Sequence, residues 1–131
     1  MKKGYLLLVV FVLIANVTFS QKSSLDYLKQ KLNRTINHSI DISSNFGKYD
    51  SVGGKLYGWP EILDVDSQGD KIIVNGEFTY QHDDFHDFRT LNFEATIKEI
   101  LDDFTVIKVI YQNKKDNKWY KLFPINNLKD N

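Results

Sequence analysis

Residues 71–99, KIIVNGEFTYQHDDFHDFRTLNFEATIKE, contain the clearest structural pattern in this chain. Apolar and polar residues alternate along this stretch with a period of two, which is typical of strands that bury one face. The pattern predicts two strands, Lys71–Gln81 and Asp87–Glu99, joined by a turn centred on Asp84-Phe85. The residues expected on the buried face of the second strand are Leu91, Phe93, Ala95 and Ile97.

The register of this hairpin follows from its apolar residues, because a slip of one residue would send every apolar side chain to the wrong face. Matching the two buried sets predicts these cross-strand pairs: Phe78 with Leu91, Val74 with Ala95, Ile72 with Ile97, and on the solvent face Glu77 with Asn92.

Two further strands are expected downstream. In Phe104–Gln112 the apolar residues start on even positions and finish on odd ones, so one inserted residue near Val106-Ile107, a β-bulge, is needed to keep them on one face. A polar turn, Asn113–Lys118, then leads to a last strand, Trp119–Phe123.

Upstream, Tyr57, Trp59, Leu63 and Val65 alternate with mostly polar or small residues and predict a first strand. Pro60 lies within it and cannot donate a backbone hydrogen bond. We therefore expect this strand to lie at an edge of the sheet or to be broken at the proline.

An amphipathic helix is expected before the strands, over Leu25–Ile36, because Leu25, Leu28, Leu32 and Ile36 recur at helical spacing. Residues 37–54 are rich in Ser, Asn, Asp and Gly and predict a long connection with room for a short strand.

The elements together predict a single α+β domain over residues 21–131, in which one N-terminal helix packs on a bent antiparallel meander of about five strands. This element order, with the charged turn and strand Lys115–Tyr120, resembles cystatin-like and nuclear-transport-factor-like folds. The resemblance covers the element order and the last hairpin, no signature residue of either family aligns, and it implies a fold without a function.

The first twenty residues read as a cleaved export signal. Lys2 and Lys3 form a cationic start, Tyr5–Ala15 is an apolar run of eleven residues, and small residues precede a cleavage point after Ser20. An uncleaved anchor is the alternative, although a membrane span needs about 20 apolar residues. We expect a mature protein from Gln21 that is periplasmic or secreted and leaves no part in the membrane.

Charge and cysteine content narrow the function classes. The chain has 17 basic and 17 acidic residues, and loss of Lys2 and Lys3 with the signal leaves 15 basic against 17 acidic. No basic run interleaves with aromatic residues, so no nucleic-acid partner is expected. The absence of cysteine excludes disulfides and lipid attachment after the signal, which favours a bacterial envelope or secreted protein held together by its core.

The segment His82-Asp83-Asp84-Phe85-His86-Asp87 is the one polar cluster with metal-binding residue types, and its candidate ligands are His82, His86 and Asp87. The hairpin register places His82 on the core side across from Asp87 and turns His86 outward. A solvated turn is therefore the favoured interpretation, a metal site is the alternative, and no cofactor is expected.

Exposed aromatic residues are the remaining candidates for a binding surface, and the four that we select are Trp59, Phe85, Trp119 and Tyr120. Because strand neighbours face opposite ways, either Trp119 or Tyr120 must point away from the core. The sequence favours an exported, non-enzymatic module that binds a protein or a small apolar ligand. The alternatives are an enzyme that uses His82 or His38 with a carboxylate, and an inhibitor or immunity-type protein against an exported toxin or hydrolase.

Overall fold

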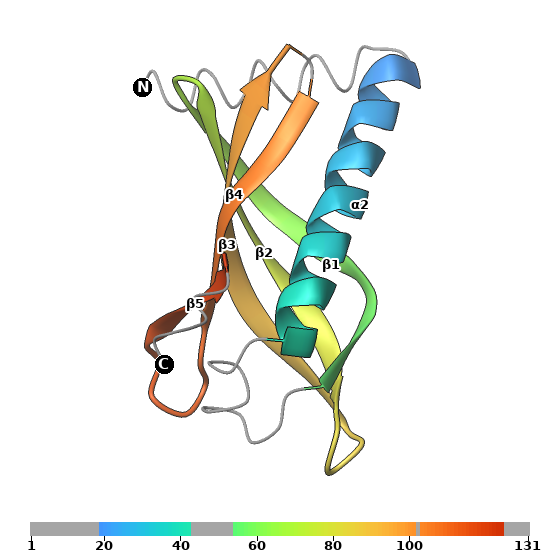
Figure 1. Ribbon diagram of the computed structural model, residues 1–131, viewed down its shortest axis with the longest axis vertical. Coiled ribbons are helices and arrows are strands. Elements are labelled where there is room, and N and C mark those ends of the chain that lie inside the picture. The colour runs from blue at the N-terminus through green and yellow to red at the C-terminus, as the bar shows by residue number, and fades with distance from the viewer. Residues whose placement is uncertain (1–18, 43–53, 102, 125–131) are drawn as a thin grey trace.

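The computed structural model describes residues 19–42, 54–101 and 103–124, and in it one helix packs against a five-stranded antiparallel sheet (Figure 1). The strands follow one another in the sheet in chain order, so the predicted α+β meander is confirmed. In this part of the chain no helix combines the length and apolar character that crossing a bilayer requires. The elements are α2 (Phe19–Ile42), β1 (Gly54–Gln68), β2 (Lys71–His82), β3 (Phe88–Ile100), β4 (Asp103–Gln112) and β5 (Trp119–Phe123).

The central hairpin of β2 and β3 has the predicted register. The four predicted pairs, Phe78 with Leu91, Val74 with Ala95, Ile72 with Ile97 and Glu77 with Asn92, all occur. The predicted bulge in β4 is also confirmed, because Ile97 pairs with Val106 while Thr96 pairs with Lys108. Ile107 is the extra residue, and it allows Val106 and Val109 to be buried on the same face.

Strand β1 lies at the edge of the sheet and is interrupted, as Pro60 predicted. Its pairing with β2 shifts between Tyr57 and Glu61 and again between Ile62 and Asp64. Each shift changes which side chains face the core, so the four alternating residues of the sequence pattern do not share one face. Val65 is buried, and Leu56 and Ile62 pack partly against the core, whereas the exposed residues are Tyr57, Trp59 and Leu63.

Helix α2 extends beyond the predicted range at both ends. Residues 37–42, expected in a connection, continue the helix, because Ile40 adds a fourth apolar position to the buried stripe. The rest of that expected connection, residues 43–53, lies outside the described residues. The buried helix stripe is Leu28, Leu32, Ile36 and Ile40.

The bent sheet holds the helix from two sides, since α2 contacts β1 at one edge and β4 and β5 toward the other (Figure 1). A polar contact fixes the β4 side. The Tyr27 hydroxyl donates to Asp103 Oδ1 at 3.1 Å, and Lys31 Nζ lies 3.6 Å from the same oxygen. The hydrogen bond between the side chains of Lys31 and Tyr27, and then the nearby Asp103 carboxylate, raise the pKa of Lys31 above its usual value.

Candidate functional site

His82, a candidate metal ligand and acid–base group, closes the β2–β3 turn. Its ring is buried, and Nδ1 accepts backbone N–H bonds from Asp84 at 3.1 Å and Phe85 at 3.2 Å. The backbone N–H of His82 donates to the Asp87 carbonyl at 2.9 Å, and the backbone N–H of His86 donates to the His82 carbonyl at 2.8 Å. The imidazole therefore caps the turn by accepting two of its backbone N–H groups.

Asn113 has the same role in the β4–β5 turn. Its Oδ1 accepts the Lys115 N–H at 2.8 Å, its N–H donates to the Lys118 carbonyl at 2.9 Å, and its carbonyl accepts the Asn117 N–H at 2.8 Å. The last loop residue of each turn is left-handed, with φ of 62° at His86 and 61° at Asn117. The two turns share one geometry, so the position of His82 has a structural explanation.

The structure does not assemble a metal centre from the predicted ligands. His86 is exposed at the turn while His82 is buried, as the register predicted. Within residues 19–42, 54–101 and 103–124, no group of three His, Asp or Glu side chains is arranged to hold a metal ion. His38, the other acid–base candidate, lies exposed on α2.

The four predicted ligand-binding aromatics are separated in the fold. Trp59 lies on β1 and Trp119 on β5, at opposite edges of the sheet, and Phe85 lies in the β2–β3 turn. Trp119 points outward with 44% of its surface exposed, while Tyr120 is half-buried with its ring 6.0 Å from that of Tyr111. These residues do not form one patch.

Trp59 is the predicted residue that lies beside a hollow. Two adjoining depressions between α2 and β1, of about 520 and 470 Å³, both have Trp59 in their wall and open to solvent. We call them together the α2–β1 groove. Its other lining residues are Asp26, Tyr27, Lys29 and Gln30 in the first depression and Asn33, Asn37, Asp41, Lys55, Leu56 and Gly58 in the second.

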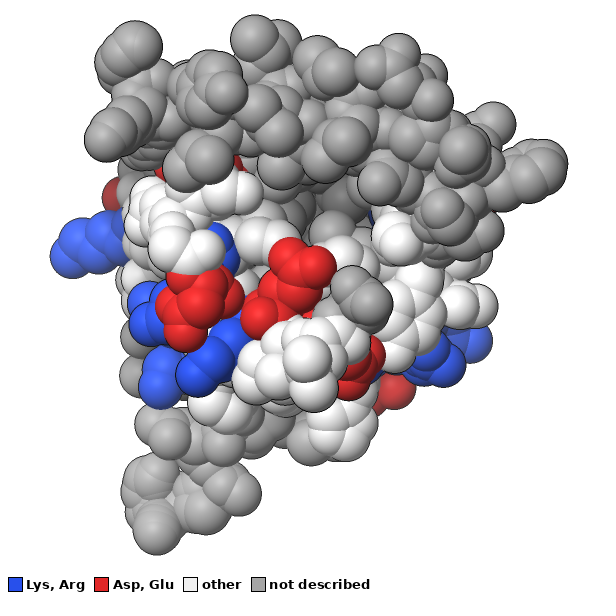
Figure 2. Space-filling view, turned by 90° about the horizontal axis from the view of Figure 1, so that it is seen from above, with Lys and Arg blue, Asp and Glu red and all other residues white. Residues whose placement is uncertain are grey.

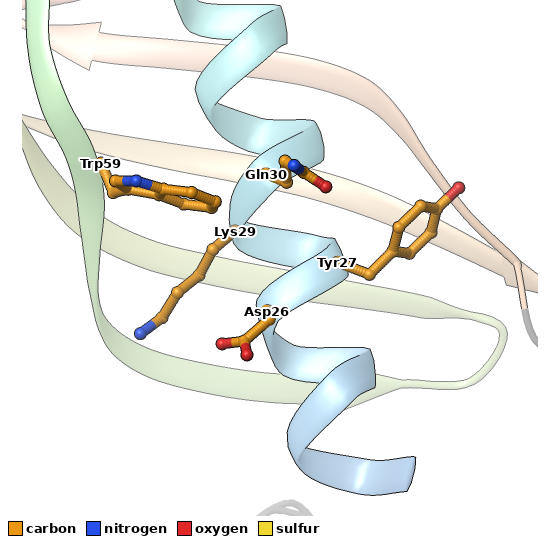
Figure 3. Close-up of a pocket in the computed structure, with 5 residues that line it drawn as sticks. All are labelled: Asp26, Tyr27, Lys29, Gln30 and Trp59. Atoms are coloured by element: carbon orange, nitrogen blue, oxygen red, sulfur yellow. The ribbon is translucent and has the colours of Figure 1, made fainter. Parts of the chain in front are cut away.

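In the first depression Trp59 extends from β1 toward the helix, with Lys29 next to it, whereas the Gln30 side chain points away from the indole (Figure 3). Asp26 lies one turn away along the helix, and Tyr27 leaves the helix on the opposite side from the indole. Trp59 is 53% exposed.

The helix side of the groove is a polar stripe. Its positions recur at spacings of three and four, so they share one helix face beside the buried apolar stripe. The amide Oδ1 of Asn33 is buried and has no hydrogen-bond partner among the described residues. Sequence reasoning missed this stripe because it matches an ordinary solvated face. The stripe is Asp26, Gln30, Asn33, Asn37 and Asp41.

A third hollow, of about 510 Å³, lies between β3 and the β4–β5 turn. Its lining includes Arg89, Lys114 and Lys115. The Arg89 guanidinium is already engaged, because Nε lies 3.2 Å from Asp87 Oδ2. None of the three hollows is lined by a histidine.

Comparison of the chain with protein-family models, with curated proteins and with solved structures finds no match.

Proposed function

We propose that the protein is an exported, non-enzymatic binding module that holds its ligand in the α2–β1 groove against Trp59. The observation that carries the proposal is the position of this indole. A tryptophan that is 53% exposed stands at the junction of two depressions, with hydrogen-bonding side chains on the facing helix. A large ring beside convergent polar groups is the usual composition of a ligand site.

The alternative of acid–base catalysis has less support. A catalytic pair needs a histidine or carboxyl group whose protonation is tuned by burial and by its neighbours. The buried ring nitrogen Nδ1 of His82 is occupied by two backbone amides, and His38 and His86 are exposed. The groove carboxylates Asp26 and Asp41 are also exposed, as suits groups that orient a ligand.

The test of this function uses the chain's two tryptophans. A Trp119→Phe variant leaves Trp59 as the single indole and makes its fluorescence a reporter of the groove. We expect at least one member of a panel of peptides, oligosaccharides and small apolar compounds to shift the Trp59 emission, and mass spectrometry to recover that compound unchanged. The matched Trp59→Phe variant, which reports on Trp119, should show no shift. A panel without effect on Trp59, or a ligand converted to product, would overturn the proposal.

Export is tested separately, by the cell fraction that contains the protein and by its N-terminal residue. The charged start and apolar run of residues 1–20 support a mature N-terminus at Gln21. N-terminal sequencing of the protein from envelope and culture fractions should begin at Gln21. A protein that is found in the cytoplasm with Met1 intact contradicts this part of the proposal.

A second candidate, an inhibitor or immunity-type protein, is supported by the β2–β3 turn. Phe85 is 67% exposed at its tip, and the Arg89 guanidinium lies over its ring at 5.4 Å. The flanking carboxylates of Asp83, Asp84 and Asp87 are exposed. An aromatic ring between carboxylates is complementary to a cationic cleft.

The two turns of equal geometry provide a sharp test of this second candidate. Replacing residues 83–86 with Lys-Lys-Asp-Asn, the sequence of residues 114–117, keeps the turn and removes the ring and most of the negative charge. Inhibition of purified exported hydrolases with cationic clefts should be lost in this variant if the turn is the inhibitory element. Inhibition that the swapped variant retains would rule out this turn.

A further inference from the structure

We infer that the ligand of the α2–β1 groove is a neutral oligosaccharide, an inference that rests on the function proposed above. Sugar rings combine an apolar face of C–H groups with an equator of hydroxyl groups. A site for them therefore needs an exposed flat aromatic ring next to side chains that both donate and accept hydrogen bonds. In the groove, Trp59 is the exposed aromatic ring, and the polar stripe of α2 provides the hydrogen-bonding side chains.

The position of Trp59 suits a chain rather than a single ring. The indole stands between the two depressions and lines both. A sugar ring stacked on it has space on either side for a neighbouring ring. The depressions run beside successive turns of α2, from Asp26 in the first to Asp41 in the second, so a linear oligomer follows the helix axis.

Three of the hydrogen-bonding groups in the groove wall are carboxamides, namely Gln30, Asn33 and Asn37. Each carboxamide can accept from one hydroxyl and donate to another, which matches the dual character of a sugar hydroxyl. Asn33 has an unsatisfied Oδ1, and a buried polar atom without a partner is energetically costly. Asn33 lines the second depression, so a ligand hydroxyl bound there is a candidate partner for its amide.

The charge of the groove argues for a ligand without net charge. Asp26 and Asp41 are balanced by Lys29 and Lys55. A site for phosphate or a polyanion concentrates cations instead. The described surface in Figure 2 likewise has Lys and Arg next to Asp and Glu, without a field of one sign.

A peptide added as a strand to the edge of β1 fits less well. Strand addition needs a regular row of free backbone groups, and β1 has pairing irregularities at residues 57–61 and 62–64. Pro60, beside Trp59, has no N–H to offer. A peptide helix needs apolar anchors on the facing wall, whereas the stripe of α2 is polar.

The experiment measures binding of the purified full chain to tetrasaccharides of glucose, xylose, mannose and N-acetylglucosamine by saturation-transfer NMR and titration calorimetry. We expect at least one of them to bind, with an affinity unchanged between about 50 and about 500 mM NaCl because no charge is neutralised. Trp59→Ala should weaken binding at least tenfold, and Asn37→Ala several-fold. Trp119→Ala, which removes an exposed indole from the opposite edge, is the matched control and should bind normally.

The outcomes separate this inference from the proposed function. Peptides or charged oligosaccharides that bind at Trp59 while every neutral tetrasaccharide fails would overturn the ligand class and leave the binding function standing. Neutral sugars that bind equally to the Trp59→Ala and Asn37→Ala variants would overturn the site. Failure of all compounds in the Trp59 fluorescence panel overturns both. Circular dichroism of each variant confirms that lost binding does not reflect lost folding.

Discussion

His82 is a residue type that often acts in catalysis, but here its ring accepts hydrogen bonds from the backbone of the β2–β3 turn. A histidine at the end of β2 offers Nδ1 to two amides, as Asn113 offers Oδ1 at the end of β4. The register of the hairpin placed this ring in the core from sequence alone. Its acceptor role was not predictable, because histidine is not among the residues that usually cap turns.

Substitution of His82 tests this role. His82→Ala should lower the free energy of unfolding by about 1–3 kcal/mol, because the amides of Asp84 and Phe85 lose their acceptor. His82→Asn should recover most of that loss, since Asn113 shows that a carboxamide fits the same turn. Urea denaturation measures both. An alanine variant as stable as the parent would show that the two bonds contribute nothing.

Asp116 provides a pH-dependent prediction at the same scale. The hydrogen bond from the Tyr120 hydroxyl, and then the backbone N–H of Lys118, lower the pKa of its carboxyl group below the usual value. A carboxyl with a lowered pKa in the folded state contributes stability at neutral pH, and this contribution is lost as the pH falls below about 4. NMR titration should show that Tyr120→Phe raises the pKa of Asp116. Tyr27→Phe, whose hydroxyl bonds to Asp103 instead, should leave it unchanged.

The secondary-structure elements that could be predicted are those whose pattern lies within their own residues. The β2–β3 register follows from alternation, and the bulge at Ile107 follows from the change of parity along β4. The end of α2 was missed because Asn37, His38 and Ser39 are weak helix formers, and burial of Ile40 outweighs their propensity.

The candidate site was predictable only in part. Trp59 was expected to bind ligand, but its partners on α2 were not, because only the bend of β1 brings them together. This bend depends on the irregular segment from Tyr57 to Asp64. A pattern with period two does not show at which residues such a segment switches the face that its side chains point to. A polar stripe becomes a groove wall only once the opposing strand is placed.

The irregular pairing of β1 requires a glycine, Gly76, at the facing position of β2. A Cβ at Gly76 would clash with the Glu61 carbonyl oxygen and press on the Phe93 ring, so only glycine lets the bulged strand approach. Gly76→Ala should cost about 1–3 kcal/mol of stability, as overpacking typically does. It should also weaken any ligand bound at Trp59, because β1 must move. Gly69→Asn, in the β1–β2 turn with open space and φ of 68°, is the control that should change little.

On the scale of the whole molecule, one helix and one bent sheet share a single core, so neither is expected to be stable alone. Four of the sixteen buried apolar residues in the described part of the chain come from the α2 stripe. The helix contacts β1, β4 and β5. The groove wall is the outer flank of the same helix. The proposed groove and the stability of the fold therefore both depend on the docking of α2 on the sheet.

This shared dependence predicts the behaviour of helix variants. Leu32 is fully buried, and Leu32→Ala should lower stability by about 2–5 kcal/mol while unfolding stays cooperative. Helix circular dichroism and hydrogen exchange of β1 amides should report the same loss, because α2 covers that edge strand. Arg34→Ala, an exposed change on the same helix, should stay within about 0.5 kcal/mol of the parent. If the helix signal is lost while β1 amides keep their protection, the helix is a separable lid, and the groove requires a folding step of its own before it can bind.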